Sequence, residues 1–247
     1  MKKTMILIGN FLFKYRNYLF PAYILALFLI FMPPSSEAGT GLLRVIALIL
    51  ALGGLLVRGV VIGLAYIKRG GVNKKVYADD LVTEGMFSIC RNPLYFGNML
   101  IYAGEFLMFG NLACFILGVL SFWFIYECII AAEENYLRNK FGSGYDEYCK
   151  DVPRWIPDFP RFSEAKKGVK FNFSKVITKD YSTMLSTLLV LAAIEIWRVL
   201  ASTGLEGHEG YVAFLVIGVV VLSLIATYVR YTKKQGAKKR EAASEAA

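Results

Sequence analysis

Metal-ligating residues are scarce in this chain. Its one histidine, His208, has no metal-ligand company, and its four cysteines show no C-x-x-C spacing. These absences argue against a zinc site and a disulfide framework, so we predict no metal ligands and assign His208 no function. Charged residues are also few, at 19%, whereas a soluble domain of this size would need more polar surface.

Long apolar stretches dominate instead, since 56% of the residues are hydrophobic and the mean hydropathy is +0.50. Roughly 20 apolar residues cross the hydrocarbon core of a bilayer. Four stretches are long enough, and two shorter ones reach this length if their charged flanks lie inside a bundle. The six candidate spans are residues 17–36, 45–67, 92–104, 106–126, 181–194 and 210–229. We predict an all-α integral membrane protein of one domain and about six transmembrane helices, with a tight helical hairpin at residues 109–111.

Lysine and arginine are missing from the loops on one side of these spans. Residues 33–41, 109–111 and 202–210 contain none, whereas the segments on the other side hold 25 of the 28. The positive-inside rule then predicts that both termini are cytoplasmic, in the plasma or inner membrane if the source is bacterial. The net charge of +9 reflects topology and attraction to anionic lipid, and we expect no nucleic-acid partner. Residues 233–247 form the predicted basic cytoplasmic tail.

The third span begins with a polar sequence, R-N-P-L-Y-F-G, at residues 91–97. Asn92 is a preferred N-cap and Pro93 suits the first helical position, which gives these two a structural explanation. Arg91 and Tyr95 have no such explanation. A helix N-terminus beside an arginine also suits a carboxylate or phosphate, and Gly97 would let a ligand or another helix approach the backbone.

Two glutamates, Glu133 and Glu134, lie at the predicted cytoplasmic end of the fourth span. Neighbouring carboxylates repel one another and need a cationic or hydroxyl-rich partner. Arg138 is the structural alternative for Glu134, because residues four apart share a helix face. It would satisfy only one of the two. Amphipathic rings suited to a membrane interface follow at Tyr145, Tyr148 and Trp155.

Charged residues inside the predicted spans are costly in lipid and should face the bundle. Arg58 in the second span and Glu105 beside the third are expected to pair with each other or with a substrate headgroup. Glu195 and Arg198, one helical turn apart, are expected to form a local ion pair.

Two motifs carry a family resemblance. The first motif, residues 85–97, reads G-x-F-x-x-x-R-N-P-x-Y-x-G. The second motif, residues 133–157, contains E-E-x-x-L-x-x-x-F-G-x-x-Y-x-x-Y and then V-P-R-x-I-P. Together, over residues 76–160, they resemble the integral-membrane methyltransferases, a group that includes isoprenylcysteine carboxyl methyltransferases and phospholipid N-methyltransferases. The resemblance implies an S-adenosyl-L-methionine site facing the cytoplasm, a capping segment after the second motif, and a lipid substrate that enters from the bilayer.

Carried over by residue, the resemblance implies that the start of the third span forms the pocket wall, that a preceding loop covers the cofactor, and that the fourth span holds it. The residues are Arg91, Asn92, Tyr95 and Gly97 in the wall, Leu81, Val82 and Gly85 in the loop, and Glu133 and Glu134 in the fourth span. Prenylcysteine enzymes usually have His where this chain has Asn92, and Asn cannot act as a general base. For the chemistry itself we single out Arg91, Asn92 and Glu134, the last as the candidate base for an amine acceptor.

Alternatives remain open at this stage. A membrane sterol or isoprenoid reductase using NADPH would have a similar membrane fold, and a non-catalytic lipid-binding protein would retain the pocket without turnover. The sequence leaves undetermined the methyl acceptor, the oligomeric state and the role of the last two spans in residues 181–229. It also does not say which glutamate binds which cofactor group.

Overall fold

The structure is a computed structural model that describes residues 2–34, 41–64, 76, 78, 80–167 and 170–245. Helices are its regular elements, and no strand occurs in these ranges. The elements are α1 (Lys2–Phe31), α2 (Gly41–Leu64), η1 (Gly85–Ser88), α3 (Pro93–Phe109), α4 (Leu112–Phe141), α5 (Ser143–Asp151), η2 (Phe159–Arg161), α6 (Phe162–Ala165), α7 (Phe173–Ser202) and α8 (Glu209–Glu245). The prediction of an all-α fold is confirmed.

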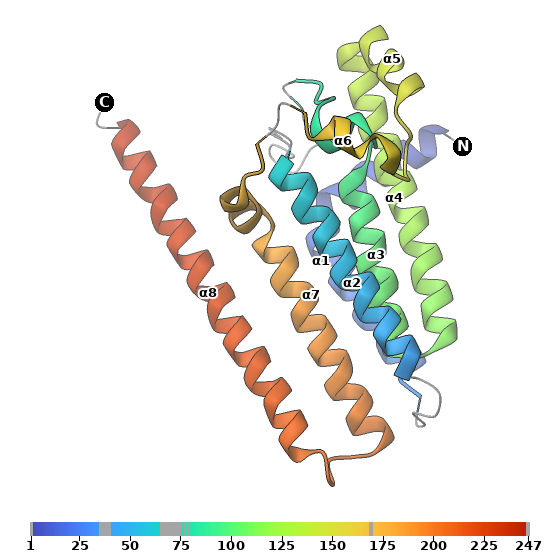
Figure 1. Cartoon of the computed structure of the whole chain (residues 1–247), viewed down its shortest axis with the longest axis vertical. Coiled ribbons are helices and arrows are strands. Elements are labelled where there is room, and N and C mark those ends of the chain that lie inside the picture. The colour runs from blue at the N-terminus through green and yellow to red at the C-terminus, as the bar shows by residue number, and fades with distance from the viewer. Residues whose placement is uncertain are drawn as a thin grey trace.

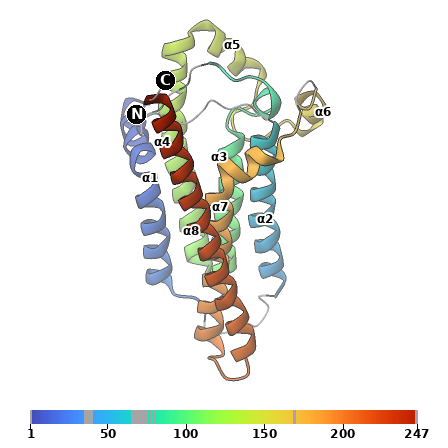
Figure 2. The same cartoon turned by 90° about the vertical axis from the view of Figure 1, so that its left-hand side faces the viewer.

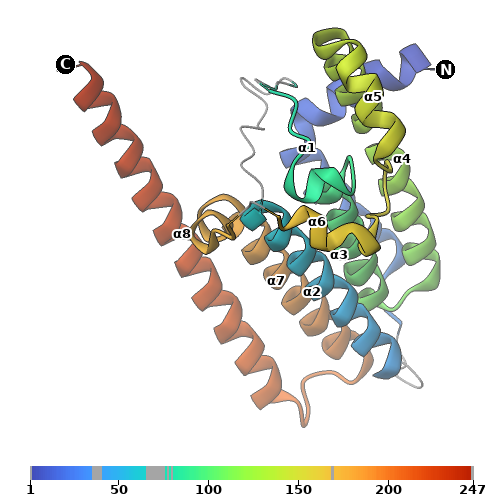
Figure 3. The ribbon, with the colours of Figure 1, turned by 45° about the horizontal axis from the view of Figure 1, so that its top comes forward.

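Helices α1, α2, α3, α4 and α7 run side by side, with α5 and α6 gathered at one end and the α7–α8 turn at the other (Figure 1). From that turn α8 diverges from the other helices toward the C-terminus (Figures 1 and 3). The free ends of α1 and α8 both lie toward the end that carries α5, as two perpendicular views agree (Figures 1 and 2). A view onto that end shows η1 and α6 lying over the helix ends (Figure 3). We call this end, with α5, η1 and α6, the capped end.

Four helices are long and apolar enough to cross a membrane: α2, α4, α7 and residues 209–232 of α8. The other two predicted spans, α1 and α3, do not meet this criterion. α3 has 17 residues, and α1 carries Lys14 and Arg16 near the middle of its 30 residues. The prediction of six spans is therefore supported for four. Part of the second predicted span, residues 65–67, lies outside the described residues.

Small residues bring α2 and α3 together. A Cβ atom added to Gly104 would lie 2.6 Å from the carbonyl oxygen of Ala47, and one added to Gly54 would lie 2.5 Å from that of Gly97. Such contacts allow close backbone packing, which is how transmembrane helices associate when lipid supplies no hydrophobic drive. Gly97 was expected to let either a ligand or another helix approach its backbone, and the structure shows the approach of another helix, α2.

The predicted hairpin between α3 and α4 is confirmed. Gly110 ends α3 with a φ of 84°, a left-handed conformation that glycine adopts without a Cβ clash. Asn111 then caps α4 by accepting a hydrogen bond from the Cys114 N–H at 3.1 Å, and its side-chain amide donates to the Phe31 carbonyl at 3.0 Å. One short turn thus joins the ends of α1, α3 and α4.

The end of the bundle opposite the cap is closed by a buried ionic cluster. The predicted pair of Glu195 and Arg198 is present, with Nη1 and Oε2 3.6 Å apart. Glu195 also pairs with Arg44 of α2 and accepts from the Tyr211 hydroxyl of α8 at 3.1 Å. The pair is therefore not only local, because it connects α7 to two other helices.

The predicted tail is not a separate segment in the structure. α8 continues as one helix to Glu245 and so includes most of residues 233–247, of which the last two lie outside the described residues. At its other end the chain forms a single helix from Lys2, and therefore α1 starts well before the predicted span at residue 17.

Candidate active site

The two motifs converge at the capped end of the bundle. The extended segment 152–158 of the second motif passes beside the start of α3. The N–H of Arg91 donates to the Pro153 carbonyl at 2.8 Å, and the side-chain amide of Asn92 donates to the Arg154 carbonyl at 3.0 Å. Two further hydrogen bonds run from Cys90 Sγ to the Trp155 carbonyl at 3.1 Å and from the Asp158 N–H to the Ile89 carbonyl at 2.9 Å. Asn92 thus occupies the predicted N-cap position, but its side-chain amide bonds the second motif instead of capping α3.

Beside this junction, two arginines and two glutamates form one charged network. Glu134 Oε1 accepts from Arg91 Nη1 at 3.2 Å and from Arg154 Nε at 2.9 Å. Arg154 Nη1 donates to Glu127 Oε2 at 2.7 Å, and Glu127 Oε1 accepts from the Trp155 indole at 2.6 Å. Burial alone would lower the pKa of Arg154, but the charges of Glu134 and Glu127 outweigh burial and raise this pKa. The network ties α4 to both motifs.

Glu134 does not use the partner expected from helical spacing. Arg138 instead pairs with Asp146 of α5, with Nε and Oδ1 2.7 Å apart. Gly142 explains the difference, because its φ of 56° ends α4 and turns the chain into α5. The turn brings Asp146 to Arg138 and leaves Glu134 to the arginines of the two motifs.

The aromatic rings of the second motif hold it against the rest of the capped end. The Tyr148 hydroxyl donates to the Phe87 carbonyl in the first motif at 2.7 Å. Trp155 stacks on Trp123 of α4 with ring centroids 5.3 Å apart. Tyr145 is buried, and burial first, then the charge of Glu134, raises the pKa of its hydroxyl above the ordinary value. The three rings therefore make specific contacts within the protein, besides any contact with lipid.

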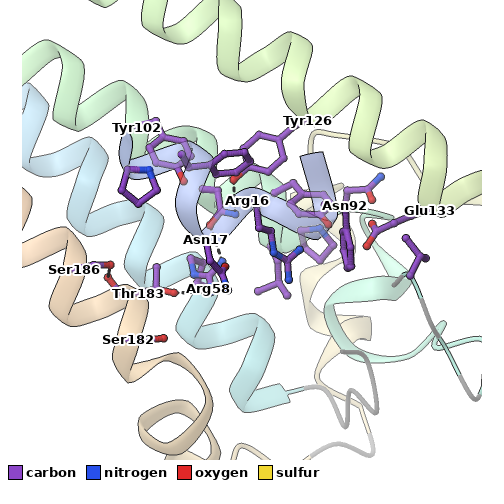
Figure 4. Close-up of a pocket in the computed structure, with 18 of the residues that line it drawn as sticks. Arg16, Asn17, Arg58, Asn92, Tyr102, Tyr126, Glu133, Ser182, Thr183 and Ser186 are labelled. Atoms are coloured by element: carbon purple, nitrogen blue, oxygen red, sulfur yellow. Dashed lines mark hydrogen bonds between the residues drawn. The ribbon is translucent and has the colours of Figure 1, made fainter. Parts of the chain in front are cut away.

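A cavity of about 730 Å³ opens next to the junction, between α1, α3 and α4 (Figure 4). Asn92 and Glu133 lie at one end of it, and Ser182, Thr183 and Ser186 of α7 lie at the other. Every long helix contributes to its walls. The residues are Phe13, Arg16, Asn17, Phe20, Pro21 and Ile24 of α1, Arg58 of α2, Pro93, Leu94, Tyr95, Asn98 and Tyr102 of α3, Tyr126, Glu133 and Leu137 of α4, Ser182, Thr183 and Ser186 of α7, and Arg230 of α8. Val76, Ala78 and Phe87, from the segment before α3, complete the lining.

Of the predicted site residues, Asn92, Tyr95 and Glu133 line this cavity. Arg91 and Glu134 lie in the charged network next to it, where the buried Nε of Arg91 has no hydrogen-bond partner among the described residues. The five are brought together at one end of the bundle, and whether they bind a cofactor stays a prediction.

The remaining predicted residues lie behind the cavity wall. Gly97 faces Gly54 and Arg58 of α2. Leu81 packs with the cluster around Leu137 and Tyr145, whereas Val82 packs with a second cluster. The second cluster consists of Val61, Leu64, Met86, Phe87, Ile89 and Ala165. Gly85 is buried and begins η1 with a φ of 60°. Within the described part of the loop, the residues that reach the cavity are Val76, Ala78 and Phe87.

Arg58 is held by partners that the sequence did not identify. Its guanidinium pairs with both carboxylate oxygens of Asp180 on α7, with Nε 3.0 Å from Oδ2. It also donates to Asn98 Oδ1 at 2.6 Å and to the Thr183 hydroxyl at 3.2 Å. The Asn98 amide donates in turn to the Tyr126 hydroxyl at 2.9 Å, so the network crosses α2, α3, α4 and α7. The expected pairing of Arg58 with Glu105 was wrong, although the expectation that Arg58 faces the bundle was correct.

Comparison with known proteins identifies similar sequences for the central part of the chain. Residues 43–144 match the family model described as phospholipid methyltransferase. A protein-S-isoprenylcysteine O-methyltransferase of Schizosaccharomyces pombe is 36% identical over 80 residues, which are 32% of this chain and 34% of that protein. The central part of this chain is similar to the isoprenylcysteine and phospholipid methyltransferase-like membrane proteins. With its four apolar helices, the chain is a multi-pass membrane protein.

Two other relatives match similar parts of this chain. Protein-S-isoprenylcysteine O-methyltransferase B of Arabidopsis thaliana is 36% identical over 77 residues, covering 31% of this chain and 39% of that protein. The nickel-cobalt-cadmium resistance protein NccN of Alcaligenes xylosoxydans xylosoxydans is 28% identical over 120 residues, covering 48% of this chain and 56% of that protein. The matched segments thus span about a third to just over half of these relatives. No solved structure matches significantly. The described residues contain no cluster of three metal-ligating side chains.

Proposed function

We propose that this protein transfers a methyl group from S-adenosyl-L-methionine to a lipid or lipid-linked acceptor at the cytoplasmic face of the membrane. The observation that carries the proposal is the convergence of the first and second motifs beside one cavity. The first motif and the start of the second lie in the segment that matches the methyltransferase family model. A carboxylate, phosphate or amine headgroup could be the acceptor.

The side chains near the cavity fit the groups of this cofactor. S-adenosylmethionine supplies a methyl group on a cationic sulfonium, and it also carries a carboxylate, an ammonium and ribose hydroxyls. Arg91 has a buried donor, Nε, that no group of the described residues satisfies. This donor and the N-terminus of α3 at Asn92 suit the carboxylate. Glu133, with Tyr95 in the same wall, suits the ammonium or the hydroxyls. Glu134 holds Arg91 and Arg154 in place and is the candidate base for an amine acceptor.

The other predicted site residues support the wall of the cavity. We propose that Leu81, Val82 and Gly85 hold the loop whose Ala78 and Phe87 reach the cavity, and that Gly97 allows α2 to pack closely enough to form its wall. Segment 152–158 and α5 would then act as the cap. A closed cap favours transfer because the reaction depends on alignment and on the exclusion of water.

The orientation that we propose for this site rests on charge. We propose that α1 and α3 complete a set of six spans, and that the capped end faces the cytoplasm because the segments there hold most of the Lys and Arg residues. The site would then lie where a soluble cofactor and a bilayer lipid can both reach it.

A labelling experiment tests the proposed function. Membranes containing the protein are incubated with S-adenosylmethionine labelled in its methyl group, and lipids and protein are then separated and counted. We expect label in a lipid fraction with the wild type, a strong loss with Glu133→Gln, and no change with Glu147→Gln, a matched control on the exposed face of α5. Absence of label with the folded wild type, together with oxidation of NADPH, would replace the proposal with the reductase alternative, which the family match does not favour.

A further inference from the structure

The end of the cavity away from Glu133 is built by helices that lie outside the family-matching segment. Ser182, Thr183 and Ser186 come from α7, and Arg16 and Asn17 come from α1, whereas the match covers residues 43–144. Figure 4 shows the α7 hydroxyls on the opposite side from Asn92 and Glu133, with Arg16 and Arg58 drawn between them. We call this region the α7 end of the cavity.

Positive charge is in excess at the α7 end. Among the described residues, three arginines line the cavity, and the one carboxylate that lines it, Glu133, is at the other end. Asp180 neutralises Arg58, because its carboxylate receives two of the guanidinium donors. Arg16 has no carboxylate partner among the described residues, and its recorded contact is with the ring of Phe13, 4.2 Å from Cζ to the centroid. The charge of Arg58 is therefore balanced by Asp180, whereas no carboxylate of the described residues balances the charge of Arg16.

The cavity also has an apolar surface of the kind that a lipid chain needs. Phe13, Phe20 and Ile24 of α1 line the cavity, and they are spaced seven and four residues apart, so they share one face of that helix. Leu94 and Tyr102 of α3 line it too. A ligand that combines an apolar chain with a charged head would satisfy both parts of the wall.

We propose, resting on the methyltransferase function proposed above, that the α7 end is the acceptor subsite and that it takes an anionic oxygen headgroup, a carboxylate or a phosphate. Arg16 is the ion-pairing group, and the hydroxyl of Thr183, which accepts from Arg58 and keeps its own proton, is the neutral donor beside it. Asp180 and Arg58 are positioning residues that fix α7 against the cavity. An ammonium headgroup is disfavoured because it would meet the Arg16 cation without a carboxylate to offset the repulsion.

Binding of simple amphiphiles tests this subsite without turnover. The full-length protein in nanodiscs of zwitterionic phosphatidylcholine is titrated with dodecyl phosphate, dodecanoate or dodecylamine, and empty nanodiscs give the correction for partition into lipid. We expect at least one anionic probe to bind more tightly than dodecylamine. The anion that binds more tightly distinguishes a phosphate headgroup from a carboxylate headgroup.

Variants of α1 identify the group responsible. Arg16→Gln should weaken binding of the anionic probe by about tenfold or more, since a hydrogen bond to a charged group is lost. Arg16→Lys should restore part of it. Lys14→Gln, which removes a cation from the same helix but not from this cavity, should leave it unchanged. Equal binding by wild type and Arg16→Gln, or tighter binding of dodecylamine, would overturn the subsite.

Titration with S-adenosylhomocysteine separates this result from the proposed function. If the subsite is correct, Arg16→Gln binds S-adenosylhomocysteine as the wild type does, which also shows that the variant is folded. If the wild type binds the anionic amphiphile but not S-adenosylhomocysteine, the methyltransferase proposal fails while an anion-binding cavity stands. If it binds S-adenosylhomocysteine but no anionic probe, the subsite fails alone.

Discussion

The ion pair between Arg58 and Asp180 provides the sharpest test of how the bundle is held together. The Arg58 side chain is 12% exposed and that of Asp180 is 2% exposed, so both charges are largely removed from solvent. Replacing Asp180 with Leu leaves the arginine without its counter-ion inside the bundle. Breaking such a buried pair costs about 3–5 kcal/mol, because one charge stays buried and uncompensated. At about 2–4 °C for each kcal/mol in a chain of this size, the midpoint of thermal unfolding should fall by roughly 6–20 °C.

A double-mutant cycle supplies the control for this prediction. Arg58→Met should destabilise the protein too, since it leaves the Asp180 carboxylate unpaired in the bundle. The double variant with both apolar residues should recover most of the loss, because a well-packed apolar pair often equals a buried ion pair in stability. Unfolding is followed by circular dichroism in one detergent for all four proteins. If the two single effects simply add in the double variant, the coupling energy is zero and the interaction does not stabilise α7 against α2.

Further predictions follow from packing, burial and charge. Gly104→Ala should destabilise the protein by about 1–3 kcal/mol, because the new methyl group meets the backbone of α2. Gly53→Ala is the control, since the added atom meets nothing within 4 Å and should leave stability unchanged. Equal melting points of the two variants would contradict the close packing. Burial raises the pKa of the Cys90 thiol to about 11, so a maleimide reagent at pH 7.5 should label it only after denaturation, and rapid labelling of the native protein would contradict its burial. Glu127→Gln should speed amide hydrogen exchange in segment 152–158, because the charged contacts that anchor this segment to α4 are weakened, and unchanged exchange would show that the backbone bonds suffice.

Much of the fold could be predicted because the signals were local. Apolar runs identified the helices, and the Phe-Gly-Asn turn predicted the hairpin, whose Gly110 and Asn111 act as the expected helix stop and start. Helix ends were less accurate, since α1 begins 15 residues before the predicted span and α8 continues through the predicted tail. Apolarity shows where a helix can be buried in lipid, and it does not show how far a polar helix continues beyond it.

The candidate site also contains residues that could be predicted from local motifs and residues that could not. The two motifs were predicted to meet, and Asn92, Tyr95 and Glu133 do line one cavity. Residues contributed by α1 and α7 were missed, because no local pattern shows which helices will be neighbours. One signal was available: Arg58 in a membrane span requires a counter-ion, and Asp180 directly precedes the fifth predicted span. The choice between Asp180 and Glu105 depended on helix packing that sequence spacing does not contain.

Titration calorimetry with S-adenosylhomocysteine and, separately, with NADPH tests the central claim most directly. If the two motifs together form a methyl-donor site, purified protein should bind S-adenosylhomocysteine at micromolar concentrations, and Arg91→Ala and Glu133→Ala should each abolish the heat of binding while the fold is retained. Binding of NADPH alone, or binding of S-adenosylhomocysteine that neither substitution affects, would contradict the account.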